Sequence, residues 1–408
     1  MTYDNGKVID VQAAAPVVRE RRVKGNVLVL GNSGVGKSTL INAVIGDQVA
    51  RTSFGTRGTT SELMVYESDA VPFRVIDSIG FEPSPIKSLK AVHAVRSWSK
   101  ASAKEDGEGH RIDVIWFCVD GTAAKLFPQT IRNLSNAVAM WRSVPIITVI
   151  TKSYSKPDRE RNVAMVREAF AGQRVERNLR AIVPVVAQTY VLDETAFAGP
   201  EGIGDLIDAT MQAMPDGMHG GAQDLMAFKL NRKRVLAQGL IGACVAAGAT
   251  VGAVPLPIAD SLVLSPLELA ELNGLARLYG IDKDEDSRHF LDAIVQVGTA
   301  GTVAHAAISA IKAIPGINIA ASALNAVVAA SIIAALGEGA VAAFEQVAAG
   351  RRSIQDVGWV RHLMQDQFGD GFLGKVSDVA KASQAGDAKD MSQMIVDLVK
   401  AVFMGRGK

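Results

Sequence analysis

The chain has 408 residues, of which 43 are lysine or arginine and 42 are aspartate or glutamate, giving a net charge of +1 at pH 7. This length exceeds what one ordinary hydrophobic core serves, so at least two domains are expected. The balanced charge predicts no long-range attraction to nucleic acid or anionic lipid, and no nucleic-acid partner is predicted.

The cysteines and the first residues bear on the cellular compartment. The two cysteines, Cys118 and Cys244, each lie in an apolar stretch. This placement argues against a disulfide framework and predicts buried thiols in a reducing compartment. The opening MTYDNGKVIDVQ has no charged start followed by an apolar core, which argues against secretion. A cytoplasmic location is expected.

Composition divides the chain near residue 215. Short β-branched runs alternate with mixed helical segments before this point, and long Ala/Gly/Ile/Val stretches follow it. PDGMHGGAQD (215–224) has the Pro, Asp and Gly content of a linker. The predicted organisation is an extension (1–23), an α/β domain (24–214), this linker, and an all-helical, Ala/Gly-rich domain (225–408).

In the first domain, apolar runs typical of strands alternate with helical patterns. The predicted strands are 26–31, 62–67, 73–77, 113–120, 145–151 and 181–187. The predicted helices are 85–100, 128–142, 157–178 and 201–213. This alternation predicts a mainly parallel sheet with helices on both faces, whose ligands bind at the carboxyl ends of the strands.

GNSGVGKS (31–38) lies at the carboxyl end of the first predicted strand and fits G-x-x-x-x-G-K-[ST]. Its glycines let backbone N–H groups point at phosphate oxygens, since side chains there would block the approach. Lys37 is expected to reach the β- and γ-phosphates and Ser38 to give its hydroxyl to Mg²⁺. The predicted nucleotide-binding residues of this loop are Asn32, Ser33, Gly34, Val35, Gly36, Lys37, Ser38 and Thr39.

Two later segments complete the predicted phosphate site. FRVIDSIG (73–80) ends an apolar strand in Asp77, a predicted Mg²⁺ ligand, and the D-x-x-G spacing places a Gly80 N–H for the γ-phosphate. Between this segment and the phosphate loop lies RTSFGTRGTTSE (51–62), where a threonine is expected to close over Mg²⁺ when a γ-phosphate is present.

These motifs, with TKSY (151–154) and VAQ (186–188), resemble in order the nucleotide motifs of Era-like GTPases, a branch of the translation-factor-related class. The resemblance covers about residues 24–214 and implies a P-loop G domain that hydrolyses GTP to GDP with Mg²⁺. It implies Lys37, Thr60 and Gly80 as catalytic residues and Ser38, Thr60 and Asp77 as magnesium ligands. It implies Thr151, Lys152, Ala187 and Gln188 as further nucleotide-binding residues, and pairing of two copies through the nucleotide face.

Two positions depart from the family pattern. Tyr154 stands where the family has an aspartate that accepts from guanine, so either Asp158 reaches the base, or Ser153 and Tyr154 form a different pocket, or Asp158 is only an early residue of the next helix. Phe81 follows D-x-x-G where many relatives of Ras carry a water-orienting glutamine. Hydrolysis is therefore expected to be slow unless Arg57, Arg51 or a partner supplies the missing group.

The second domain contains two uncharged runs, 235–259 and 313–337, each long enough to cross a bilayer. Their Ala and Gly content, prolines and asparagines suit a buried helical bundle equally well, so an inserted hairpin and a soluble bundle both stay open. Residues 253–281 resemble the tail of a family of poorly characterised bacterial inner-membrane proteins. Asp260 in this stretch is expected to be a helix cap or a partnered core carboxylate, and amphipathic helices are predicted near 353–369 and 387–404.

Together these features predict a GTP-driven switch whose helical domain responds to the bound nucleotide, with a membrane lipid or membrane protein as an implied partner. Two alternatives remain. One is a membrane-anchored scaffold with structural nucleotide and negligible turnover. The other is an ATPase or kinase that uses the same loop.

Overall fold

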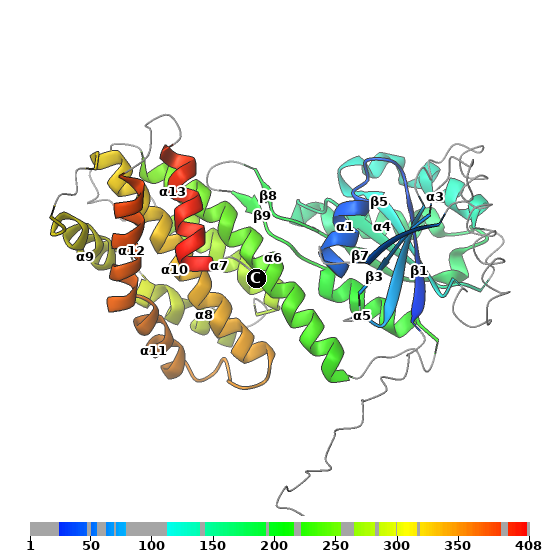
Figure 1. The fold of residues 1–408 in the computed structure, drawn as a ribbon. Coiled ribbons are helices and arrows are strands. Elements are labelled where there is room, and N and C mark those ends of the chain that lie inside the picture. The colour runs from blue at the N-terminus through cyan, green and yellow to red at the C-terminus, as the bar shows by residue number, and fades with distance from the viewer. Residues whose placement is uncertain are drawn as a thin grey trace, which may run out of the picture.

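The structure, a computed structural model, describes residues 24–46, 50–54, 63–68, 71–78, 112–138, 143–192, 196–215, 222–253, 265–281, 285–298, 300–315, 319–384 and 391–405. These residues form an α/β part built on a seven-stranded sheet, followed by a helical part (Figure 1). The predicted fold class is therefore confirmed.

The central sheet has the strand order β2-β3-β4-β1-β5-β6-β7. Strands β4, β1, β5, β6 and β7 are mutually parallel, and β3 pairs antiparallel with both β2 and β4. The strands are β1 (Gly25–Gly31), β2 (Ala50–Phe54), β3 (Leu63–Glu67), β4 (Phe73–Ser78), β5 (Val114–Asp120), β6 (Ile146–Thr151) and β7 (Leu179–Pro184). The parallel strands end at one edge, where the predicted phosphate loop follows β1.

Strand β2 corrects one expectation. The start of the predicted closing loop, 51–62, is instead a strand that pairs with β3, with Arg51 opposite Tyr66. An edge strand does not need an apolar run, and the sequence ARTSF is largely polar. A hydrophobic pattern therefore does not predict this strand. A short hairpin of β8 (Tyr190–Val191) and β9 (Phe197–Ala198) was likewise not predicted.

Helices cover both faces of the sheet because side chains along each buried strand point alternately to the two faces. In β1, Val27 and Val29 belong to one apolar cluster, and Leu28 and Leu30 belong to the other. Helices α1 (Lys37–Ile45) and α5 (Ile203–Ala213) pack on the first face; α3 (Phe127–Ala137) and α4 (Lys156–Phe170) pack on the second. Short 3-10 turns occupy Gly121–Leu126 and Glu176–Asn178. The helix predicted at 85–100 lies outside the described residues.

The helical part is organised around α10 (Ala321–Ala348), which is buried along most of its length. The other helices are α6 (Ala222–Gly252), α7 (Ser265–Tyr279), α8 (Glu285–Gly298), α9 (Ala300–Lys312), α11 (Gly358–Gln367), α12 (Asp370–Ser383) and α13 (Met391–Val399), which continues into a π-helical turn (Lys400–Met404). Helix α6 starts within the segment predicted as linker and runs between the two parts of the molecule (Figure 1). Asp260 lies outside the described residues.

Two described helices are long and apolar enough to cross a membrane by length and composition alone, Leu225–Gly252 and Ala321–Ala348. Their most apolar windows have mean hydropathies of 1.7 and 2.0 and are 50% and 89% buried inside the protein. The central helix of a soluble bundle and a helix inserted in a membrane share these properties.

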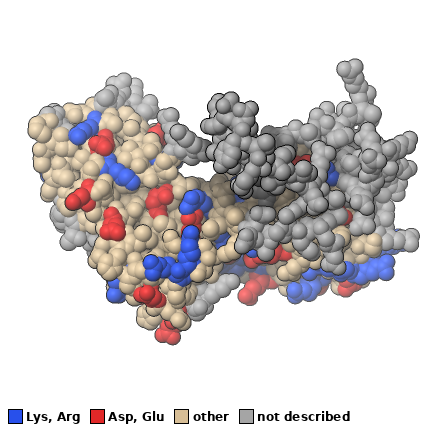
Figure 2. Space-filling model, turned by 60° about the horizontal axis from the view of Figure 1, so that its bottom comes forward, with Lys and Arg blue, Asp and Glu red and all other residues tan. Residues whose placement is uncertain are grey.

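The surface and the thiols agree with the sequence. On the face shown in Figure 2, lysine and arginine side chains are interspersed with aspartate and glutamate over the helical part. Both cysteines, Cys118 and Cys244, are buried and unpaired, as predicted.

Two glycines of α6 provide a test of helix packing. A Cβ atom at Gly252 would lie 2.8 Å from the Asn325 carbonyl oxygen and 2.9 Å from the Ala326 Cα atom of α10, whereas a Cβ atom at exposed Gly239 would meet nothing within 4 Å. We expect Gly252→Ala to lower the free energy of unfolding by about 1–3 kcal/mol, because backbone cannot yield as a side chain does. Gly239→Ala should raise it by up to about 1 kcal/mol through helix propensity. Urea unfolding of both variants measures these changes. Equal changes in the free energy of unfolding, of the same sign, would contradict the close approach of Gly252 to α10.

Candidate functional site

The loop between β1 and α1 has the backbone that a phosphate-binding loop requires. Gly34 and Gly36 have φ angles of 76° and 97°, a left-handed region that favours glycine. Gly36 is the N-cap of α1 and offers no side-chain cap, so N–H groups of the first turn stay available to a ligand. A Cβ atom at Gly31 would lie 2.6 Å from the Cys118 carbonyl oxygen, so the loop also needs glycine where it leaves the sheet.

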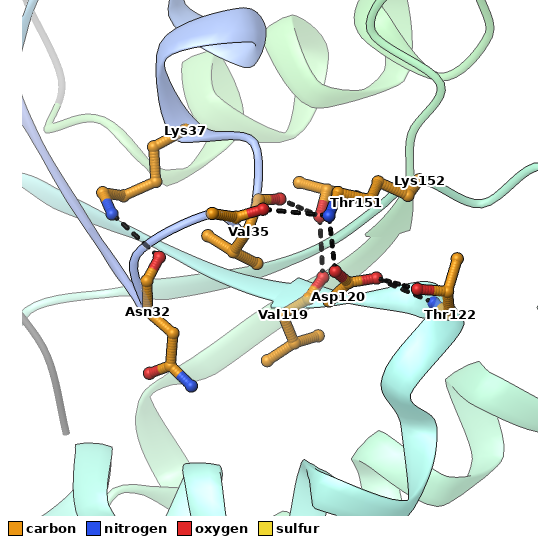
Figure 3. A network of polar contacts seen from close by, with 9 residues as sticks. Asn32, Val35, Lys37, Val119, Asp120, Thr122, Thr151 and Lys152 are labelled. Atoms are coloured by element: carbon orange, nitrogen blue, oxygen red, sulfur yellow. Dashed lines mark hydrogen bonds and ion pairs between the residues drawn. The ribbon is translucent and has the colours of Figure 1, made fainter. Parts of the chain in front are cut away.

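Lys37 is the first residue of α1, and its side chain folds back across this loop. Its Nζ atom donates to the Gly31 carbonyl oxygen at 2.9 Å and to the Asn32 carbonyl oxygen at 3.0 Å; Figure 3 shows the bond to Asn32. The ammonium group is therefore held beside the backbone N–H groups of the loop, and together they form a concentrated positive field for an anion. Ser38, the next residue, is exposed.

The segment after β6 is fastened directly to the phosphate loop. The Thr151 hydroxyl contacts the carbonyl oxygens of Val35 at 2.6 Å and Val119 at 3.0 Å. Lys152 Nζ donates to the Gly34 carbonyl oxygen at 2.9 Å and to Asp120 Oδ2 at 2.6 Å (Figure 3). Lys152 also has a positive φ of 52°, which is uncommon for a residue other than glycine. These contacts join two motifs that are more than a hundred residues apart in the sequence.

Asp120 was not predicted as a site residue. It ends β5, lies opposite Thr151 in the parallel register, and pairs with Lys152. Burial raises the pKa of Asp120, but hydrogen bonds from Lys152 and Thr122 lower it more, so its pKa lies below the ordinary value. The sequence signal was available: parallel strands end at one edge, so a polar residue closing the next strand belongs beside the loop.

Asp77, the predicted magnesium ligand, is buried in β4, beside Val29 of β1. Its Oδ1 atom is buried and has no hydrogen-bond partner among the described residues. Burial raises the pKa of Asp77, and the Lys37 ammonium group offsets this in part. A buried carboxylate oxygen without a partner is unfavourable unless a cation or donor completes it, so Asp77 fits a divalent metal ion.

The structure also describes the region where the base is expected. Ser153, next to Lys152, donates its hydroxyl to the Ile150 carbonyl oxygen at 2.7 Å, and its N–H donates to the Val185 carbonyl oxygen at 3.2 Å. The second bond ties this segment to the one that carries Ala187 and exposed Gln188. Asp158 lies in the first turn of α4 and pairs with Arg161 at 2.6 Å.

The Tyr154 ring stacks on Tyr190, with ring centroids 4.2 Å apart and planes inclined by 14°. Tyr190, at the start of the β8–β9 hairpin, was missed because a two-residue strand leaves no periodic pattern. The aromatic pair therefore occupies the position where the family pattern has the guanine-reading carboxylate.

Several predicted residues lie outside the described residues. They are Arg57, Thr60, Gly80 and Phe81.

Comparison with known proteins agrees with this geometry over the α/β part. Residues 26–152 match the model of a family described as 50S ribosome-binding GTPase. GTPase Era of Pasteurella multocida is 23% identical over 210 residues, 51% of this chain and 60% of that protein. The tRNA modification GTPase MnmE of Bordetella avium is 28% identical over 129 residues, 31% of this chain and 26% of that protein.

Among solved structures, Aquifex aeolicus Era bound to GDP and AlF4− has a TM-score of 0.31 at 20% identity, covering 52% of this chain and 67% of the other. The chain thus spans 60% and 26% of the lengths of the Era and MnmE relatives above.

The fold and the loop define a P-loop nucleotide-binding domain of the mainly parallel α/β type. Within that class, residues 26–152 match the 50S ribosome-binding GTPase family, and the amino-terminal half of the chain is similar to GTPase Era. The family match ends at residue 152, so the resemblance of the helical tail to bacterial inner-membrane proteins stays a prediction.

Proposed function

We propose that the chain binds GTP, hydrolyses it to GDP and phosphate with Mg²⁺, and changes the packing of its helical region with the nucleotide state. The observation that carries this proposal is the bond from Lys152 Nζ to the Gly34 carbonyl oxygen, with the Thr151–Val35 contact beside it. It joins the motif expected at the base to the loop expected at the phosphates. One nucleotide would then hold both ends of a single network.

Each residue has a role in this proposal. Backbone N–H groups of 32–39 and the Lys37 ammonium group bind the β- and γ-phosphates, while Lys152 packs on the base and fixes the loop. Ser38, Thr60 and Asp77 hold Mg²⁺, and the unpartnered Asp77 Oδ1 atom supports that assignment. The metal, when bound, neutralises charge on the phosphate oxygens. The Gly80 N–H meets the γ-phosphate, and Thr151, Ala187 and Gln188 complete the base site.

Turnover in this proposal is slow for the isolated chain. Water attacks the γ-phosphorus and the bond to the bridging oxygen breaks, and catalysis consists mainly of positioning and charge stabilisation. The phenyl ring of Phe81 cannot orient that water. A second copy of the chain pairing through the nucleotide face, or another partner, supplies the missing group.

The two functional units in this proposal are residues 24–214 and 225–408, in the cytoplasm. The two apolar helices support an association of the second unit with the bacterial inner membrane, through lipid or a membrane protein. A membrane-anchored scaffold that holds nucleotide without turning it over is the second candidate function, favoured by Phe81 and Tyr154. Phosphate release with and without liposomes separates the two.

Base selectivity tests the assignment of GTP. We expect wild-type protein with Mg²⁺ to bind GTP at least tenfold more tightly than ATP in equilibrium titrations. Tyr154→Asp should widen this ratio by a further tenfold or more, because a carboxylate accepts two guanine N–H groups and leaves adenine unpaired. Asp158→Ala serves as the matched control, since Asp158 is engaged with Arg161, and should leave the ratio unchanged. Tighter binding of ATP by the wild type would defeat the guanine assignment.

A further inference from the structure

Helix α1 is held at its carboxyl end by a residue from the other part of the molecule. Arg232 of α6 donates from Nε to the Ala43 carbonyl oxygen at 3.1 Å and from Nη2 to the Asn42 carbonyl oxygen at 3.2 Å. These carbonyls belong to the last turn of α1, which carries no basic residue of its own. A guanidinium group there satisfies helix-end acceptors and complements the negative end of the helix dipole.

The contact is built into the local backbone. Arg232 is only 8% exposed although it carries a charge. Gly46 ends α1 with a φ angle of 100°, and a Cβ atom at that position would lie 2.6 Å from Arg232 Nη1. Gly46 thus provides both the left-handed turn and the space that the guanidinium group occupies.

The same short helix has the phosphate loop at its other end. Helix α1 has nine residues, which corresponds to a length of about 13 Å. At one end, Lys37 bonds to the carbonyl oxygens of the phosphate loop; at the other, Arg232 bonds to carbonyl oxygens of the last turn. The position of α1 along its axis is therefore fixed from both ends. A shift of the guanidinium group would move the first-turn N–H groups relative to a bound phosphate.

Helix α6 continues from this contact into the core of the helical part. Two residues beyond Arg232, Arg234 pairs with Glu345 of α10, and Gln238 donates to Glu338 of α10 at 2.6 Å. A cavity of about 150 Å³ lies between the first turn of α5 and this stretch of α6, with Arg232 in its lining. Helix α6 is therefore held by hydrogen bonds from Arg232 to α1 and by polar contacts with α10, and the cavity lies beside the stretch that joins them.

From this geometry we infer that Arg232 is a positioning residue for the phosphate loop and the mechanical link between bound nucleotide and α6. The inference rests on the proposed function, because it requires nucleotide at the loop. By linkage, an arrangement of α6 that alters nucleotide affinity is itself altered by nucleotide to the same extent.

The test measures nucleotide affinity and the response of α6 separately in the full chain. Titration with fluorescent GTP and Mg²⁺ gives affinity, and hydrogen exchange of the 225–252 amides with and without GTP gives the response. In wild-type protein, GTP is expected to change exchange in α6. Arg232→Gln should weaken GTP binding about tenfold and abolish that change at saturating GTP, and Arg232→Lys, which keeps the charge without the fork of donors, should be intermediate.

Lys229→Ala is the matched control. Lys229 lies on the same helix and also reaches the α/β part, through an ion pair with Asp208 at 2.7 Å whose partners are partly exposed. It should leave affinity within twofold of wild type and preserve the α6 response. If Arg232→Gln does not fold, Arg232→Lys is the deciding variant. A reduced α6 response in Arg232→Lys would support the link, and a response equal to wild type would overturn it.

An Arg232→Gln response equal to wild type would overturn the link while leaving the proposed function standing. Wild-type protein that binds GTP without an α6 response would overturn the link and the proposed change in helical packing, while leaving GTP binding and hydrolysis standing. A wild type that binds no GTP would overturn both.

Discussion

Replacing Lys37 with alanine is expected to weaken binding of GTP with Mg²⁺ by about 100-fold and to bring phosphate release to background. Lys37 Nζ lies against the loop carbonyls of Gly31 and Asn32, within the array of N–H groups that the phosphates would meet. A charge-assisted contact of this kind contributes about 3 kcal/mol, and each 1.4 kcal/mol corresponds to roughly tenfold in affinity. Isothermal titration and a phosphate-release assay measure the two effects.

Lys156→Ala is the control for Lys37→Ala. Lys156 is an exposed lysine at the start of α4, so its loss changes net charge equally without touching the loop. Its GTP affinity should stay within twofold of wild type. Equal GTP affinities in the Lys37→Ala variant and the wild type would contradict the phosphate-loop assignment. Equal rates of phosphate release would contradict the proposed GTPase activity.

Replacing Glu268 with glutamine is expected to raise the free energy of unfolding by roughly 3 kcal/mol at pH 8 and to change it little at pH 4. Burial raises the pKa of Glu268 in α7 from 4.5 to about 7. One pKa unit corresponds to about 1.4 kcal/mol, which sets this magnitude. Glu268 lies near Glu271, whose pKa is also raised by burial and by the charges of Glu268 and Glu338.

The pH window follows from the direction of the Glu268 shift. Between pH 4.5 and 7 the folded state keeps a proton on Glu268 that the unfolded state has lost, so stability falls as pH rises through this window. Below pH 4.5 both states are protonated, and above pH 7 both are ionised, so the slope from this group vanishes. Glutamine does not titrate and removes this part of the slope.

Urea unfolding from pH 4 to pH 8 measures the Glu268 effect. Asp378→Asn is the control, because the Asp378 side chain is 71% exposed and lies 3.9 Å from Lys381. It should retain the wild-type slope. If the free energy of unfolding of Glu268→Gln changed with pH as it does in the wild type, Glu268 would have an ordinary pKa in the folded protein.

Much of the α/β part was predictable because its strands are buried and apolar. Runs such as VLVL and VIWFCV carry a continuous hydrophobic signal, and the phosphate loop has a spacing that needs no tertiary information. The edge strand β2 and the β8–β9 hairpin escaped because polar or two-residue strands give no such pattern. Asp120 and Tyr190 escaped with them, since their place in the site depends on strand register and stacking between distant segments.

The helical part was predictable only in outline. Proline cannot continue a helix, and α6 ends at Gly252, shortly before Pro255, while α10 starts at Ala321, shortly after Pro315. Helix α12 was missed, because the amphipathic pattern near 353–369 and 387–404 did not extend across it. The bond from Arg232 to α1 spans 189 residues and leaves no mark in local sequence.

A single apolar cluster extends from Val27 in β1 through Met211 and Phe228 to Val399 in α13. The α/β and helical parts therefore share one continuous hydrophobic interior. A truncated chain that ends after α5 would lose the helical share of this cluster, and the apolar surface left uncovered would favour self-association. The intact chain should lose both parts in one concerted melting transition, so an excised G domain is a poor substitute for it in biochemical work.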